Sequence, residues 1–160
     1  MSNLIDRVNP YVGLPYIDGQ QDCYGLVRRI YQEHFGMRLR NYARPVGFDH
    51  YGVDLIEENF RREGFSVINL PLTELEPGDG LLFAVASRMI NHIGIVTQGD
   101  MFLHHLYQRV SSHDALDVRW KNRLVHVVRH PDVTEFNQKN RESLDLLSLI
   151  PPHLRMRFDH

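Results

Sequence analysis

The spacing of apolar residues changes near residue 64, which limits the chain to folds that place helices before a sheet. Over Cys23–Phe35 apolar residues recur every three or four positions, the period of one helix face. From residue 65 onward they fall in short runs separated by turn residues, as in strands. The order predicts an α+β fold, with N-terminal helices packed on a central antiparallel sheet.

Two helices and five strands are predicted. Asp22 is placed to cap the first helix, Cys23–Phe35, and Gly36 to end it. The run Gly80–Ala86 is apolar on both faces, which predicts a central strand. The segments His92–Thr97 and Met101–Tyr107 flank a glycine-containing loop and predict a hairpin. The remaining predicted elements are a helix at Val53–Glu63 and strands at residues 65–68 and 124–128.

Composition excludes several classes of protein. The 18 basic and 20 acidic residues give a net charge of −2, so no strong field favours binding to nucleic acid. The single cysteine cannot form an internal disulfide or a cysteine-rich zinc site. The first residues lack the apolar stretch of a signal peptide, and the longest apolar run, Leu81–Ala86, is too short to span a membrane. We expect a soluble protein made in the cytoplasm.

Cys23 has two interpretations. A free cysteine on the apolar side of a helix is often a small core residue. Cys23 also occupies the first position of its helix, where the dipole and free N–H groups stabilise a thiolate, lower the thiol pKa and offer donors to an oxyanion. Gly25 would let a substrate backbone approach the sulfur. In this second interpretation the thiol needs a base.

The hairpin places two of the ten histidines together. A loop at residues 98–100 puts His104 opposite Gly94, which makes His92 a diagonal neighbour of His104 on one sheet face. Gly94 would leave space for an imidazole to turn. One histidine could then act as the base while the other fixes its tautomer. His105 points to the opposite face and receives no role.

Other candidate sites are weaker. His126 and His130 have the spacing of two metal ligands on a helix, but their segment is predicted as a strand and no glutamate accompanies them. No phosphate-binding glycine loop is present, and we expect no metal and no cofactor. Trp120, the single tryptophan, is interpreted as a packing residue or as the lining of a groove.

Four motifs, in order along the chain, resemble those of the NlpC-type cell-wall cysteine peptidases, a papain-like family. The matching segments lie within residues 10–130 and are Leu14–Gly19 with Asp22–Val27, Leu75–Asp79, His92–Val96 and Met101–His104. The resemblance implies the papain-like NlpC fold. It implies that Cys23 attacks a peptide bond, that His92 is the base and that His104 orients His92. The residues implied in oxyanion or substrate binding are Tyr16, Asp22 and Tyr24.

Some segments resemble a tail-assembly branch of the family that bacteriophages carry. They are Cys23–Arg28, Tyr31–Met37 and Asn41–Ala43. This branch implies a protein of the virion tail that is made in the host cytoplasm, meets other tail-tip proteins and acts at the host cell wall. The implied substrate is the peptidoglycan stem peptide, cut between D-glutamate and a diamino acid.

Two further functions stay open on the sequence. The same fold could be a catalytically silent plug or assembly factor of the tail tip, or a peptidase that matures another tail protein. Residues 1–131 are expected to form the peptidase domain. Residues 132–160 change from polar to apolar and are expected to form a C-terminal extension that docks on a partner.

Overall fold

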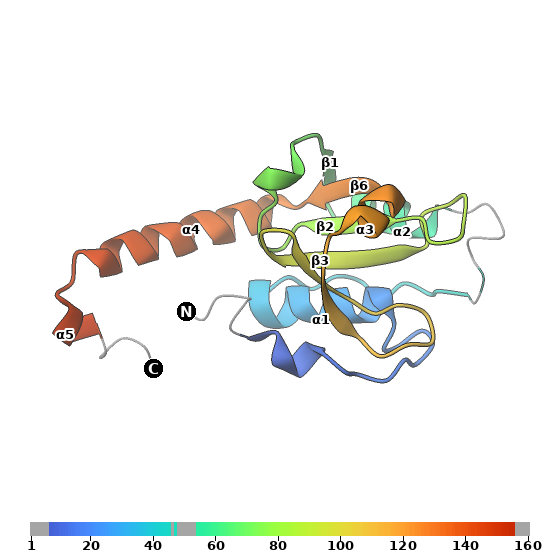
Figure 1. Cartoon of the computed structure of the whole chain (residues 1–160), viewed down its shortest axis with the longest axis horizontal. Coiled ribbons are helices and arrows are strands. Elements are labelled where there is room, and N and C mark those ends of the chain that lie inside the picture. Colours follow the sequence, from blue (N-terminus) through green and yellow to red (C-terminus); the bar gives the residue numbers. More distant parts are fainter. Residues whose placement is uncertain (1–6, 46, 48–53, 156–160) are drawn as a thin grey trace.

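The computed structural model describes residues 7–45, 47 and 54–155. It has one antiparallel sheet of six strands in the order β1-β6-β2-β3-β4-β5 (Figure 1). The strands are β1 (Ser66–Ile68), β2 (Gly80–Phe83), β3 (His92–Gln98), β4 (Met101–His104), β5 (Ser112–Ala115) and β6 (Leu124–Arg129). The helices are α1 (Cys23–Phe35), α2 (Leu55–Arg62), α3 (Val118–Arg123), α4 (Pro131–Ser148) and α5 (Pro152–Arg155), with 3-10 turns at Asn9–Tyr11 and Leu72–Glu74. The predicted α+β class is confirmed.

Helix α1 begins and ends where the sequence predicts. The Asp22 carboxylate accepts a hydrogen bond from the Gly25 N–H at 2.8 Å, which satisfies one of the free donors at the helix start. Gly36 ends the helix in the left-handed conformation, at φ 68°. The buried face of α1 packs on one face of the sheet (Figure 1), against residues that include Ile93 and Leu103.

The sheet separates two apolar clusters. Ile93, Ile95 and Leu103 face α1, whereas the alternate residues Val96 and Phe102 face a second cluster on the other side. All four residues of β2 are buried, and β2 lies between β6 and β3. The predicted central position of this strand is confirmed.

The strands differ from the prediction in their extent. β2 ends at Phe83 because the chain then enters a loop in which the Asn91 side chain bonds both backbone groups of Val85. The predicted pairing of Gly94 with His104 is confirmed, but Gln98 pairs with Met101, so the turn contains Gly99 and Asp100 alone. The strand and α-helices without a predicted counterpart are β5, α3, α4 and α5. The second helix begins at Leu55, and its predicted first residue, Val53, lies outside the described residues.

Helix α4 extends away from the sheet (Figure 1). Its first turns belong to the core, because Val133 is fully buried and Asn137 donates a hydrogen bond to the Pro77 carbonyl at 2.9 Å. Farther along, Leu144 and Leu146 are exposed. A division of the chain between residues 131 and 132 thus falls within the first turn of α4. Among the described residues, no helix has the length and hydropathy of a membrane span.

The Asp79–Arg129 ion pair yields a stability prediction. Asp79 is fully buried, and both of its oxygens accept hydrogen bonds from Arg129 at 2.7 Å. The Asp79→Ala substitution removes both hydrogen bonds and leaves the guanidinium with Glu76 alone, at 4.0 Å, so we expect it to lower the free energy of unfolding by about 3 kcal/mol in urea denaturation. Asp100→Ala, at an exposed turn, is the matched control. A loss below about 1 kcal/mol for Asp79→Ala would contradict the structural role of the pair.

Candidate functional site

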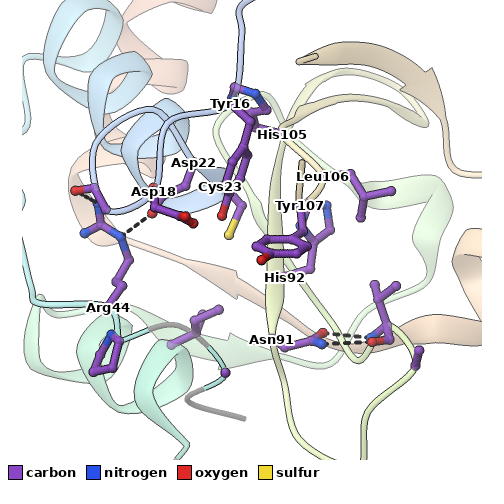
Figure 2. A pocket seen from close by; sticks show the side chains of 16 residues that line it. Tyr16, Asp18, Asp22, Cys23, Arg44, Asn91, His92, His105, Leu106 and Tyr107 are labelled. Atoms are coloured by element: carbon purple, nitrogen blue, oxygen red, sulfur yellow. Dashed lines mark hydrogen bonds and ion pairs between the residues drawn. The ribbon is translucent and has the colours of Figure 1, made fainter. Parts of the chain in front are cut away.

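A pocket of about 530 Å³ lies beside the N-terminus of α1. Residues from several elements line it: the loop before α1, the start of α1, the segment around Arg44, and the segments at each end of the β3–β4 hairpin. Of the six predicted site residues, those that line this pocket are Tyr16, Asp22, Cys23 and His92 (Figure 2).

The Cys23 sulfur points into the pocket from the first position of α1 (Figure 2). Backbone N–H groups of Ile93 and Tyr24 lie close enough to favour its thiolate. Burial and the adjacent Asp22 carboxylate outweigh them and raise the pKa of the Cys23 thiol to about 12. The expectation of a lowered pKa is therefore wrong, because the helix N-terminus also holds an anionic cap and the sulfur is partly shielded from water.

The hairpin register brings His92 and His104 into contact. His92 Nε2 lies 2.8 Å from His104 Nδ1, and the two side chains are 3% and 2% exposed. Burial lowers the pKa of His104 below its usual value and that of His92 well below it, so both imidazoles are neutral at pH 7. Gly94 does not leave space for a turning imidazole: the Phe102 ring packs over it, 2.6 Å from the position of an added Cβ.

Trp120 of α3 packs against both imidazoles. Its ring centroid lies 5.8 Å from that of His92 and 4.8 Å from that of His104. Trp120 does not line the pocket, so the interpretation as a packing residue is confirmed.

The sequence does not predict Asp114, which contacts the histidine pair directly. His104 Nε2 lies 2.6 Å from Asp114 Oδ2 and 3.2 Å from Ser112 Oγ. In the β4–β5 ladder Ser112 stands opposite His104, so Asp114 is its diagonal neighbour, as His92 is on the other side. A prediction of Asp114 would have needed a further strand after residue 104. The sequence does not indicate that strand because the β5 residues, Ser112–Ala115, are mostly polar.

Asp22 is already engaged on both oxygens. One accepts the Gly25 N–H, and the other accepts a hydrogen bond from Arg44 Nε at 2.7 Å, with both side chains of this ion pair nearly buried. Arg44 also donates to the Gly19 carbonyl, which ties the loop before α1 to the following segment (Figure 2). Asp22 therefore forms part of the pocket wall, and Arg44 compensates the charge of its carboxylate.

Tyr16 and Tyr24 lie in different surroundings. Tyr16 lines the pocket and contacts the rings of His105 and Tyr107 edge-on, at 5.4 and 5.3 Å. Burial raises the pKa of Tyr16, so its hydroxyl stays protonated and can donate a hydrogen bond. Tyr24 is not brought to the pocket: its ring is buried in the core and its hydroxyl donates to the Arg40 carbonyl at 2.7 Å. The Tyr24 side chain is therefore unavailable to a substrate.

His105 lines the pocket, although the sequence assigns it no role. It points away from His104, as predicted, toward the face of the sheet that α1 covers, and it borders the pocket because it directly follows the end of β4. His105 Nε2 bonds the Arg109 carbonyl at 2.9 Å.

No group of three His, Cys, Asp or Glu side chains with the arrangement of a metal site occurs within residues 7–45, 47 and 54–155. His126 pairs with Glu57 at 3.5 Å, while His130 accepts the Asp132 N–H at the start of α4.

Residues 12–129 match the sequence profile of the NlpC/P60 family. The chain is 30% identical to tail tip assembly protein K of Escherichia phage N15 over 126 residues, which are 78% of this chain and 51% of that protein. It is 28% identical to tail tip assembly protein K of Escherichia phage lambda over 118 residues, 74% of this chain and 58% of that protein. The chain thus spans little more than half the length of these relatives.

Solved structures confirm the fold. An NLP/P60 family protein from Staphylococcus aureus, described as similar to a lipoprotein, superimposes with a TM-score of 0.54 at 20% identity, over 79% of this chain and 39% of that one. The NlpC/p60 domain of the peptidoglycan hydrolase SagA superimposes with a TM-score of 0.52 at 16% identity, over 79% of this chain and 95% of that one. The expected papain-like NlpC fold is confirmed.

The raised pKa of Cys23 predicts slow alkylation at neutral pH. Iodoacetamide reacts with the thiolate, so we expect the rate of modification to rise about tenfold per pH unit from pH 7 to 10, without a plateau. Because Cys23 is the single cysteine, intact-mass spectrometry follows the reaction directly. The protein unfolded in urea is the control, and its rate should level off above the ordinary thiol pKa of about 8.5. A plateau of the folded protein at or below pH 8 would contradict the prediction.

Proposed function

Because the chain belongs to the NlpC/P60 family, we propose that it is a cysteine peptidase of a bacteriophage tail that cleaves peptidoglycan stem peptides at the host cell wall. The observation that carries the proposal is that Cys23 and His92 line one pocket while His92 is hydrogen-bonded to His104. The names of similar proteins support both parts of the proposal. One is a peptidoglycan hydrolase, which supports wall cleavage, and two are tail tip assembly proteins, which support a place in the tail.

In the proposed reaction the resting pair is a neutral thiol beside a neutral imidazole. The His92 ring accepts the Cys23 proton as the sulfur bonds to the substrate carbonyl carbon, and the carbonyl electrons move to oxygen. When the tetrahedral intermediate collapses, the C–N bond breaks and His92 returns the proton to the leaving amine. Water, deprotonated by His92, then attacks the thioester, releasing the acid and restoring the thiol.

The oxyanion of the intermediate requires donors. The Cys23 backbone N–H, at the start of α1, and the protonated Tyr16 hydroxyl are the proposed ones. No hydrogen bond joins Cys23 to His92, both of them described residues. Such bonds are often long before substrate binds and tighten in the complex.

The bond cut is a finer proposal. We assign it to the D-glutamyl–diamino acid bond on the family resemblance. Asp22, beside the nucleophile, is neutralised by Arg44, so its carboxylate is not free to bind a cationic group of the substrate. Mass spectrometry of the muropeptides released from purified walls would identify the bond.

The second candidate is a silent tail-tip plug or assembly factor. Two observations favour it: the high pKa of the Cys23 thiol, and the exposed leucines of α4, which could dock on another tail-tip protein. A third function, maturation of another tail protein, would need a different substrate. Tests of purified tail proteins and purified walls as alternative substrates would distinguish it from wall cleavage.

Removal of the nucleophile tests the enzymatic proposal. We expect Cys23→Ala to abolish the release of cleaved peptides from purified walls, because no thioester can form. The folded state should remain, since a methyl group replaces a half-buried thiol. Circular dichroism checks the fold, and Ser66→Ala, at an exposed position of β1 outside the pocket, is a substitution of similar size that should retain activity. Undiminished cleavage by Cys23→Ala would overturn the proposal.

Removal of residues 143–160 tests docking by the C-terminal segment. The core contacts of Val133 and Asn137 remain in this truncation, so we expect the melting temperature to change by no more than a few degrees. We expect incorporation into phage particles to fall at least tenfold, by immunoblotting of purified particles. The full-length variant Leu144→Ser/Leu146→Ser, which keeps the chain length, should reproduce the loss. Unaltered incorporation of both would exclude docking through this segment.

A further inference from the structure

His104 stands between two polar neighbours on the same face of the sheet. His92 lies diagonally across the β3–β4 ladder and Asp114 diagonally across the β4–β5 ladder. The resulting chain of contacts runs from His92 Nε2 to His104 Nδ1 at 2.8 Å, and from His104 Nε2 to Asp114 Oδ2 at 2.6 Å. Both ring nitrogens of His104 are therefore occupied.

The chemistry of these atoms fixes the position of each proton. An ionised carboxylate can only accept, so His104 Nε2 must carry a hydrogen. A neutral imidazole has one N–H, which leaves His104 Nδ1 as an acceptor. His92 Nε2 must then donate to it, and His92 Nδ1 keeps a free lone pair.

Ser112, which is bonded to the same carboxylate, favours the same arrangement. Its hydroxyl donates its single proton to Asp114 Oδ2 at 2.7 Å. Toward His104 Nε2, 3.2 Å away, the Ser112 oxygen can then only accept. Two neighbours of His104 Nε2 thus require a proton on that nitrogen.

We propose that Asp114 is a positioning residue of the site, which holds the proton on His104 Nε2 and, through His104, keeps His92 Nδ1 unprotonated as the base. The inference rests on the proposed function for its catalytic meaning. Asp114 lies outside the pocket, so its role is to act through His104.

The surroundings explain why the tautomer needs a partner to hold it. The rings of Phe102 and Trp120 confine the His104 ring, with centroids at 4.5 and 4.8 Å, and neither of these described side chains is hydrogen-bonded to it. The remaining ionisable groups near the pair are His105, which faces the other side of the sheet, and His113, beside Asp114. Of the described residues, Asp114 is thus the carboxylate in contact with His104.

Nitrogen NMR of the histidine rings tests the assignment without any substrate. In the ¹⁵N-labelled protein at pH 7, long-range ¹H–¹⁵N correlation should show protonated Nε2 and unprotonated Nδ1 on both His92 and His104. Asp114→Ala should convert His92 to a mixture in which Nδ1 carries the proton in a measurable fraction. Asp114→Glu should restore the wild-type pattern, and Asp100→Ala, at an exposed turn, should leave it unchanged.

Kinetics supply the second readout. We expect Asp114→Ala to lower kcat for stem-peptide hydrolysis about tenfold or more, with KM nearly unchanged and activity recovered in Asp114→Glu. If the wild-type protein cleaves no wall peptide, the proposed function fails while the NMR result still decides the role of Asp114. Wild-type His92 protonated on Nδ1, or an unaltered His92 tautomer in Asp114→Ala, would overturn the inference. If Asp114→Ala does not fold, Asp114→Leu, which has a similar size and no hydrogen-bond acceptor, replaces it.

Discussion

The register of the β3–β4–β5 ladders is the constraint on which the site depends. Side chains alternate between sheet faces, so a slip of one residue would move His104 to the face that α1 covers and break its contacts with His92 and Asp114. Apolar residues hold this register, because Ile93 and Leu103 must face α1 while Phe102 faces Trp120. The strand register that packs the core is therefore the same register that aligns the histidines.

The N-terminus of α1 combines opposing effects on Cys23. The helix start offers N–H donors that favour a thiolate, and the Asp22 cap that satisfies them brings a negative charge beside the sulfur. Arg44 compensates this charge in part. The site is therefore built for a thiol and a neutral imidazole, and the proposed chemistry moves a proton during attack instead of starting from an ion pair.

Local signals predict much of this molecule. Asp22 and Gly36 fix both ends of α1, and the loop near Gly99 is sufficient to place His104 opposite Gly94. Features that depend on contacts between distant segments of the chain are not predictable from local sequence patterns. β5 is an edge strand of polar residues, the Cys23 pKa depends on burial by loops, and whether His105 meets the pocket depends on which sheet face α1 covers.

The Asp114 side chain is 44% exposed, whereas His104, which is bonded to it, and His92, which is bonded to His104, are nearly inaccessible. The hydrogen-bonded chain His92–His104–Asp114 thus ends at a solvent-exposed residue on the edge strand β5. This end lies away from the cavity that would hold a peptide. An occupied cavity would exclude solvent from Cys23 and leave that outer terminus uncovered. Bulk water therefore reaches the Asp114 carboxylate whether or not the cavity is occupied.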